Sequence, residues 1–377
     1  MKVVLSVDAL APDLTGIGRY TWELAQRLPH SPQLGSVRFY RNGRWVTDPR
    51  SLLQTAAPPA LPPTSPPAKA SRPRLKLPRA VRDWGVRLAC RGSVFHGPNF
   101  FLPAWAGNGV VTVHDLSVFK FPDTHPAERI KQFERDFARS VRHARQVITD
   151  SETTRAEVMA FAGLPAGKVT AVPLGVSDMF KPVADMDAAQ PLLKYGLAPR
   201  AYALCVCTLE PRKKVAQLLA AWRLLPGSLR STYPLVLIGG NGWLSDALQG
   251  EVSQAQAQGW LHRLGYVSEA DLPLLYAGAA LFVYPSSYEG FGLPPIEAMA
   301  CGVPVVVSSQ SCLPEVTQGA ALMVNPDDTE AFCSALVKGL TDGDWRLGAV
   351  ANGLAVAASY TWERCVNETL QVYQLAL

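Results

Sequence analysis

Short apolar segments alternate with longer segments of helical periodicity along almost the whole chain, and this alternation limits the fold more than any other feature. It is typical of parallel β-sheets that are covered by helices. Each half of the chain holds about six segments that we predict as strands. They are residues 3–7, 36–40, 93–96, 110–113, 147–149 and 169–172 in the first half, and residues 203–208, 235–238, 261–264, 281–284, 305–307 and 321–324 in the second.

A chain of 377 residues is too long for one ordinary hydrophobic core, which suggests two domains. We therefore predict an α/β protein with two Rossmann-like, doubly wound domains that face a central cleft. The break falls near residues 173–200, a stretch that contains prolines and has weak periodicity. The predicted boundaries are 1–175 for the N-terminal domain, 176–358 for the C-terminal domain and 359–377 for a final helix.

Composition excludes several other classes of protein. No apolar run reaches the roughly 18 residues that a membrane span needs, and residues 1–8 predict a first strand rather than a signal peptide. The 7 cysteines are odd in number and lie mostly in apolar runs, without a CxxC pair. This pattern favours reduced, buried thiols over disulfides or a structural zinc site. A cytoplasmic location is the expectation that follows.

The positive charge is concentrated in residues 38–91, which hold 12 Lys and Arg against 2 Asp and Glu in a chain of net charge +5. Within this segment, the proline-rich residues 57–78 predict a long surface loop, and residues 75–90 predict a basic helix. One interpretation is peripheral contact with an anionic membrane surface or with a phosphate-bearing, lipid-linked acceptor. A solvated loop that leads into an ordinary helix explains the segment equally well. Nucleic acid is disfavoured as a partner, because no nucleic-acid-binding motif accompanies the charge.

Polar and glycine residues follow several of the predicted strands, where chemistry gathers in sheets of this kind. They are residues 16–20, 114–115, 210–214, 239–242 and 286–297. The last of these groups contains the strongest single signal, EGFGLPPIE at residues 289–297. Its glycines allow close approach of the backbone to a ligand, and a proline suits the first turn of a following helix, whose N-terminus attracts a diphosphate. Read alone, the segment also fits an ordinary glycine turn.

Segment 289–297 resembles the Glu-x7-Glu motif of the retaining glycosyltransferase family 4, whose members have the GT-B fold. Further similarities follow the family's order along nearly the whole chain, and some resemble its mannosyltransferase-like members. They are GIGRY at 16–20, TVHDL at 112–116 with FP at 121–122, DSET at 150–153, TLEPRK at 208–213 and YTWE at 360–363. The resemblance implies an acceptor-binding N-terminal domain, a C-terminal domain for a nucleotide-sugar donor, and a final helix that crosses back to the N-terminal domain.

The resemblance also implies roles for individual residues. In it, Arg212 and Lys213 neutralise the donor diphosphate and the departing nucleoside diphosphate, while His114 contacts the sugar near the reacting carbon. Apart from the resemblance, the sequence alone favours a structural role for His114 and predicts that Ser151 is a helix N-cap. The residues implied in catalysis are His114, Arg212, Lys213 and Glu289; those implied in donor binding are Gly16, Gly18, Val267, Gly290, Phe291, Gly292, Leu293 and Glu297.

The function implied is retaining transfer of a hexose, with mannose from GDP-mannose favoured, onto a glycan or a lipid-linked oligosaccharide in the biosynthesis of a surface polysaccharide such as lipopolysaccharide. The leaving phosphate would take the acceptor proton. We expect no cofactor beyond the nucleotide sugar and no metal, because no DxD pair is evident. The alternatives are a transferase for UDP- or dTDP-sugars, a non-catalytic subunit that binds sugar nucleotides, and a nucleotide-sugar epimerase of the same fold.

Overall fold

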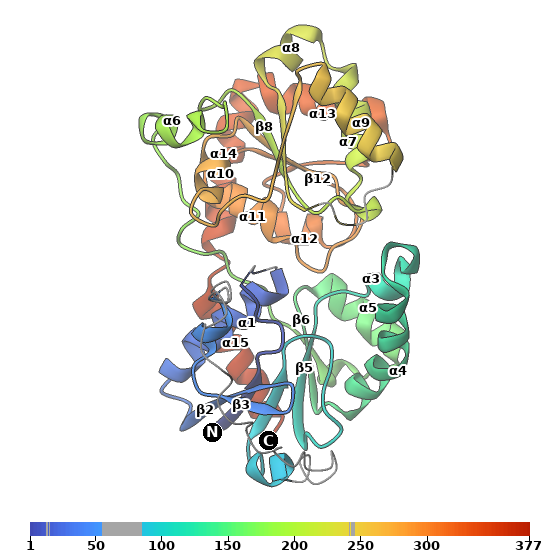
Figure 1. Cartoon of the computed structure of the whole chain (residues 1–377), viewed down its shortest axis with the longest axis vertical. Helices are drawn as coiled ribbons and strands as arrows, with labels where there is room; N and C mark the ends of the chain where they lie inside the picture. The colour runs from blue at the N-terminus through green and yellow to red at the C-terminus, as the bar shows by residue number, and fades with distance from the viewer. Residues whose placement is uncertain (13, 15, 55–84, 241, 243–245) are drawn as a thin grey trace, which may run out of the picture.

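The computed structural model describes residues 1–12, 14, 16–54, 85–240, 242 and 246–377. The described chain forms two β-sheets, each covered by its own helices, in two halves that lie one above the other in Figure 1. The fold prediction of two Rossmann-like halves is confirmed. The predicted loop over residues 57–78 lies outside the described residues, as does most of the predicted basic helix. Of that helix, residues 85–90 are described; residues 85–89 are helical and residue 90 forms a turn.

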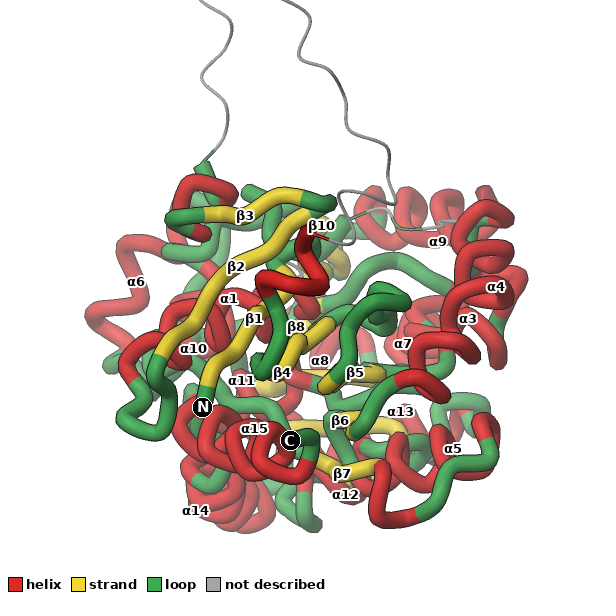
Figure 2. The backbone as a smooth tube through the Cα atoms, turned by 90° about the horizontal axis from the view of Figure 1, so that it is seen from below, coloured by secondary structure: helices red, strands yellow, loops and turns green. Residues whose placement is uncertain are grey.

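The first sheet contains seven strands among the described residues, in the order β3-β2-β1-β4-β5-β6-β7 (Figure 2). All neighbouring strands run parallel except β2 and β3. The chain direction across the sheet reverses between β1 and β4. The strands are β1 (Lys2–Ser6), β2 (Ser36–Arg41), β3 (Arg44–Val46), β4 (Val94–Gly97), β5 (Asn108–Val113), β6 (Gln146–Thr149) and β7 (Val169–Ala171).

The second sheet is fully parallel over its six described strands, in the order β10-β9-β8-β11-β12-β13. Here the direction reverses between β8 and β11. Every residue of β11 is buried, as expected for a parallel strand with helices on both faces. The strands are β8 (Ala203–Val206), β9 (Leu235–Ile238), β10 (Leu261–Gly265), β11 (Leu281–Tyr284), β12 (Val305–Ser308) and β13 (Leu322–Val324).

The helices cover both sheets, and the last helix, α15, returns to the first half (Figure 1). It packs against α1 and β6, with Trp362 and Tyr373 buried, and Thr361 caps its N-terminus. The helices of the first half are α1 (Gly16–Arg27), α3 (Ser117–Lys120), α4 (Ala127–His143) and α5 (Glu152–Ala162). Those that follow are α6 (Asp185–Leu193), α7 (Val215–Leu224), α8 (Gly227–Thr232), α9 (Asp246–Ala257), α10 (Leu272–Ala277), α11 (Leu293–Ala300), α12 (Leu313–Thr317), α13 (Thr329–Thr341), α14 (Gly343–Ala358) and α15 (Trp362–Leu375).

Most predicted strands differ from those of the structure by at most two residues at an end, and three features have a clear physical cause. Strand β3 was not predicted, because it is only three residues long and pairs at the edge of the sheet after the Asn42-Gly43 turn. Helix α1 begins at Gly16, so both glycines of the segment GIGRY lie in the helix; the packing of α1 outweighs the poor helix propensity of glycine. Strand β8 ends at Val206 rather than at residue 208. There the backbone of Cys207 passes so close to Gly239 that a Cβ on Gly239 would lie 2.1 Å from the Cys207 oxygen.

The two halves touch at the N-terminus of α5. Ser151 caps this helix, as predicted, and its hydroxyl also donates to the carbonyl oxygen of Gly290 in the second half (2.7 Å). From α12, the Glu315 carboxylate accepts hydrogen bonds from the backbone N–H groups of Glu152 (2.7 Å) and Thr153 (2.9 Å). A carboxylate suits this position, because the first N–H groups of a helix lack partners and carry partial positive charge. These hydrogen bonds join the two halves directly.

Candidate active site

A cavity of about 530 Å³ lies between the two halves, and we call it the cleft cavity. One wall follows β8 and β11, between which the second sheet reverses direction. The other wall follows β5 and β6 of the first sheet. Ligands of open α/β sheets bind outside the carboxyl ends of the strands at such reversal points. The cleft cavity is therefore the candidate active site.

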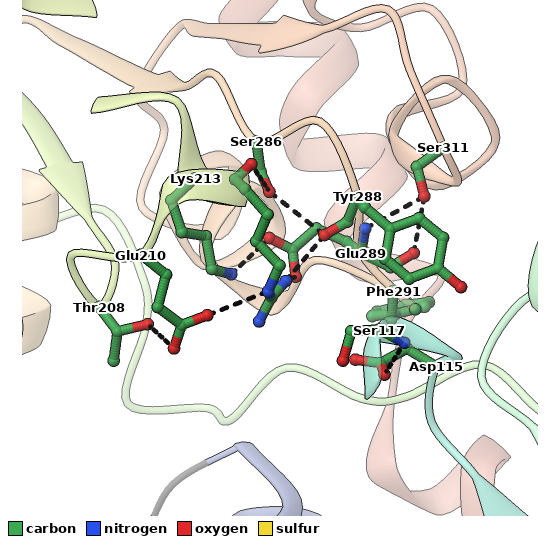
Figure 3. A network of polar contacts seen from close by, with 12 residues as sticks. Asp115, Ser117, Thr208, Glu210, Lys213, Ser286, Tyr288, Glu289, Phe291 and Ser311 are labelled. Atoms are coloured by element: carbon green, nitrogen blue, oxygen red, sulfur yellow. Dashed lines mark hydrogen bonds and ion pairs between the residues drawn. The ribbon is translucent and has the colours of Figure 1, made fainter. Parts of the chain in front are cut away.

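Lys213 and Glu289 form a buried ion pair in the wall of the second half, and their side chains point toward one another in Figure 3. Lys213 Nζ also donates to the hydroxyl of Tyr284 (2.9 Å), which in turn donates to Glu289 Oε1 (2.9 Å). Burial alone would raise the pKa of Glu289, but the charges of Lys213 and Arg212 hold it down at about 2. Glu289 is therefore a carboxylate at neutral pH.

Arg212 lies beside this pair and joins it to a second carboxylate. Its Nε donates to Glu210 (3.0 Å), and one terminal nitrogen donates to Glu289 (3.2 Å) and to the carbonyl oxygen of Tyr288 (2.8 Å). Burial lowers the pKa of Arg212, but Glu289, Asp115 and Glu210 raise it well above its ordinary value. The two cations and their two carboxylate partners cancel in charge, so an anionic ligand competes with carboxylates that already hold the cations in place.

The loop that follows Glu289 passes close to the opposite wall. A Cβ on Gly290 would lie 1.7 Å from the backbone oxygen of His114, so only glycine fits there. Gly292 has a φ of +96°, a backbone conformation that favours glycine. Helix α11 then begins at Leu293 with proline in its first turn, as predicted. Leu293 and Pro294 line the cleft cavity, so the positive end of the helix lies beside Arg212 and the Lys213 ammonium group.

On the opposite wall, His114 and Asp150 form a second buried pair. His114 Nδ1 lies 2.7 Å from Asp150 Oδ2, and His114 Nε2 donates to the carbonyl oxygen of Pro98 (2.8 Å). The ring packs edge-on against Tyr20 and Phe100. Burial lowers the pKa of His114, but the Asp150 carboxylate outweighs it, so the net shift is upward. Both ring nitrogens of His114 thus already have protein partners.

The structure gathers most of the predicted site residues around one cavity. The residues that line it are His114, Arg212, Lys213, Glu289, Gly16, Gly290, Phe291, Gly292 and Leu293. Gly18, Val267 and Glu297 do not line it. Gly18 is buried inside α1, Val267 follows β10 with 8% of its surface exposed, and Glu297 is buried in α11, where burial raises its pKa. The roles given to these residues stay predictions.

Sequence reasoning assigned no role to Tyr284, Ser311 or Asp150. Tyr284 ends β11 and bridges the Lys213–Glu289 pair, whereas the Ser311 hydroxyl donates to the Glu289 backbone oxygen (2.8 Å). Asp150 follows β6 just as His114 follows β5, and these strands are neighbours. Its position after a strand and its place in the segment DSET at 150–153 were the signals available for Asp150.

A second cavity, of about 750 Å³, lies at the reversal point of the first sheet, and we call it the side cavity. It shares Ile17 and Arg129 with the cleft cavity. Pro98, which accepts the hydrogen bond from His114, lines the side cavity, so the His114 ring links the walls of both. Its polar lining includes Ser6, Asp8, Asn42, Asn99, Glu128, Gln132, Asp136 and Arg139.

No group of three or more His, Cys, Asp and Glu that would hold a metal ion occurs among the residues that the structure describes. In the same residues, no helix has both the length and the apolar composition needed to span a bilayer. The seven cysteines all fall in the described ranges as free thiols, and six of them are buried.

Comparison with known proteins agrees with this architecture. The model "Glycosyltransferase Family 4" matches residues 14–179, and "Glycosyl transferases group 1" matches residues 196–353. The chain is 37% identical to "O-antigen chain mannosyltransferase B" of Escherichia coli over 100% of both sequences. The chain belongs to glycosyltransferase family 4. This membership confirms the predicted family and makes the protein a glycosyltransferase.

Two further comparisons place this glycosyltransferase more widely. It is 30% identical to "O-antigen chain mannosyltransferase RfbU" of Salmonella typhimurium over 61% of this chain and 60% of that one. In structure it resembles Anabaena Alr3699/HepE, solved in complex with UDP-glucose, with a TM-score of 0.72 over 99% of both chains and 15% identity. That likeness supports the GT-B fold that was predicted.

Proposed function

We propose that this glycosyltransferase moves a mannosyl residue from GDP-mannose onto a glycan or lipid-linked acceptor in surface polysaccharide biosynthesis, with retention of the anomeric configuration. One observation supports a transferase site above all: Arg212 and Lys213 lie beside the glycine loop and the N-terminus of α11. The choice of mannose is supported by full-length similarity to a protein named as an O-antigen mannosyltransferase.

In this proposal the donor diphosphate lies against the two cations and the first turn of α11. Charge builds on the leaving phosphate as the glycosidic bond breaks, and preorganised cations stabilise that charge. Glu289 holds the Lys213 ammonium in position and offers its carboxylate to hydroxyl groups of the sugar. The leaving phosphate takes the proton of the acceptor hydroxyl on the face where the hydroxyl attacks. No enzyme nucleophile, cofactor or metal takes part in this scheme.

The side cavity is the proposed acceptor site. It adjoins the cleft cavity, because Ile17 and Arg129 line both cavities, so in this proposal the acceptor hydroxyl lies near the reacting carbon. Its lining mixes carboxylates, amides and arginines, which suits the hydroxyl groups of a glycan better than a strongly anionic group. A glycan end in the side cavity leaves the cations of the cleft cavity to the donor.

Peripheral membrane contact through residues 38–91 is also proposed. Within the described part of this segment, the Arg38 guanidinium stacks 3.5 Å from the ring centre of Trp45, which is 38% exposed. Leu88 is 49% exposed, between Arg87 and Arg91. Arginines around exposed apolar side chains suit an anionic lipid surface. Co-sedimentation with vesicles of anionic or neutral lipid at low and high salt tests this, and equal binding to both lipids contradicts it.

A transfer assay on the purified full chain tests the donor. GDP-mannose, UDP-glucose and a dTDP-hexose are each offered with a mannose-terminated oligosaccharide, with and without EDTA. Product from GDP-mannose, α-linked and unaffected by EDTA, is expected. Product from a UDP- or dTDP-sugar instead would leave the fold and site unchanged and reject the donor. Loss of activity in EDTA would reject the metal-free scheme, and no transfer from any donor would favour a non-catalytic subunit.

A further inference from the structure

Asp150 is a fully buried carboxylate with one oxygen in use and one without a partner. Oδ2 contacts His114 Nδ1 at 2.7 Å, whereas Oδ1 has no hydrogen-bond partner within the described residues. A buried polar atom without a partner forgoes a hydrogen bond that water would otherwise supply. Asp150 lines the cleft cavity, although Oδ1 itself is buried, so a ligand that packs into that wall of the cavity is one source of the missing donor.

His114 cannot take over this task, because both of its ring nitrogens are engaged. The Pro98 carbonyl only accepts, so Nε2 must carry a hydrogen, and Nδ1 shares one further proton with Asp150. The pair therefore has no net charge wherever that proton lies. This arrangement fixes the orientation of the carboxylate and leaves Oδ1 as an acceptor.

Two other oxygen acceptors at this wall already have donors, whereas Nε2 of His125, which also lines the cleft cavity, has no partner among the described residues. Asp115 Oδ1 accepts from the Ser117 backbone N–H (2.8 Å), and the Gly290 oxygen that reaches across accepts from Ser151 (2.7 Å). The opposite wall presents cations to the diphosphate. The sugar of a bound donor needs acceptors for its hydroxyl groups, and Asp150 Oδ1 is an acceptor on this wall that has no donor.

We propose that Asp150 is a specificity-determining residue that accepts a hydrogen bond from one hydroxyl of the donor hexose through Oδ1, and that His114 is a positioning residue that holds Asp150. This inference rests on the proposed function, because it assumes a hexosyl donor in the cleft cavity. The pairing discriminates among hexoses: a site built around a sugar hydroxyl rejects the analogue that lacks it, since the buried acceptor then stays unpaired.

The test combines Asp150→Ala and Asp150→Asn with four donors, each lacking the hydroxyl at C2, C3, C4 or C6 of mannose. For the wild type, the analogue that lacks the hydroxyl bound by Asp150 should lose roughly 10- to 100-fold in kcat/KM, the usual effect of removing a hydrogen bond to a charged group, and analogues that lack a hydroxyl bound by Glu289 should lose activity as well. Asp150→Ala should lose a similar factor with the parent donor and show no further loss with that one analogue. Asp150→Asn keeps an acceptor oxygen, so its kcat/KM with the parent donor should lie between the values for the wild type and Asp150→Ala.

A merely structural Asp150 gives a different pattern. Asp150→Ala would then lower kcat/KM for the parent donor and all four analogues by one common factor, and that result overturns the inference. Binding of the nucleoside diphosphate, which has no hexose, checks the fold of the variants: it should be unchanged in Asp150→Asn. Failure of the proposed function is a separate outcome, because a wild type that transfers no sugar contradicts it. If the enzyme is active but the ratio of kcat/KM between the parent donor and each analogue is the same in Asp150→Ala as in the wild type, only the role of Asp150 is contradicted.

Discussion

The two walls of the cleft cavity hold their polar groups in different ways. The wall of the second half carries Arg212 and Lys213, each tied to a carboxylate. The wall of the first half carries the His114–Asp150 pair, which has no net charge and leaves one acceptor oxygen free. The difference suggests a division of work, in which one wall stabilises the charge of a leaving diphosphate and the other recognises the neutral sugar.

We call the wall with Arg212 and Lys213 the charged wall and the wall with His114 and Asp150 the neutral wall. The largest expected effect comes from removing a cation of the charged wall. Lys213→Gln should lower kcat roughly 100- to 1,000-fold, because one preorganised partner of the developing phosphate charge is lost. Initial rates of nucleoside diphosphate release at saturating donor measure this. The neighbouring Lys214→Gln is the matched control: Lys214 pairs with Asp327 and does not line the cleft cavity, so a change within about twofold is expected. Similar losses in both variants would show that the walls do not divide the work as proposed.

The walls should also respond to pH in opposite directions. The pKa of Glu289 is about 2 in the folded chain against 4.5 ordinarily, so its contribution is present above pH 4.5 and is lost as the pH falls toward 2. That contribution is on the order of 3 kcal/mol in the free energy of unfolding. The pKa of His114 is raised, so its contribution is complete below pH 6.5 and is lost as the pH rises through the folded value.

Urea unfolding of the wild type, Glu289→Gln and His114→Gln between pH 3 and pH 9 measures these contributions. The difference in the free energy of unfolding between the wild type and Glu289→Gln should become smaller at low pH. The corresponding difference between the wild type and His114→Gln should become smaller at high pH. Gaps that stay constant across the range would mean that neither side chain changes its pKa on folding.

The charged wall was the easier of the two to predict from the sequence. Its residues come from two short segments, 210–213 and 289–293, each a few residues after a strand end, so local chemistry and strand position agree. The pair on the other wall joins residues that are 36 positions apart. Its geometry depends on the alignment of β5 with β6 and on the Pro98 carbonyl, which no local pattern reports.

The side cavity shows the same limit more strongly. Its lining comes from the ends of β1, β2 and β4 and from one face of α4, so no continuous motif marks it. Glu297 illustrates a different limit: its spacing within the motif places it in α11 as expected, but the residue is buried and is not part of the cavity lining, and its role in donor binding stays a prediction. Spacing in sequence specifies a helix face, while the packing of that helix decides what the face meets.

A smaller loss should follow from pushing the two walls apart. Gly290→Ala places a Cβ 1.7 Å from the His114 oxygen, and the two backbones must separate to relieve the clash. A cost of about 1–3 kcal/mol, typical of overpacking, should lower kcat/KM roughly 10- to 100-fold. Gly250→Ala in α9 is the control, because a Cβ there meets nothing within 4 Å. Activity of Gly290→Ala within twofold of the wild type would imply that the walls work without this contact.

The smallest effects are expected for the stability of two variants, in each of which a carboxylate that joins the two halves is replaced. Glu315→Gln removes the charge that accepts the N–H groups of Glu152 and Thr153, and should lower stability by about 1–2 kcal/mol. Glu269→Gln breaks a pair with Arg19 in which the Glu269 side chain is 50% exposed, so a change below about 0.5 kcal/mol is expected, and it should vanish in high salt. Thermal unfolding at two salt concentrations measures both. If Glu315→Gln changes nothing, the walls are apart in the ligand-free enzyme, and the donor itself must bring the charged wall and the neutral wall together.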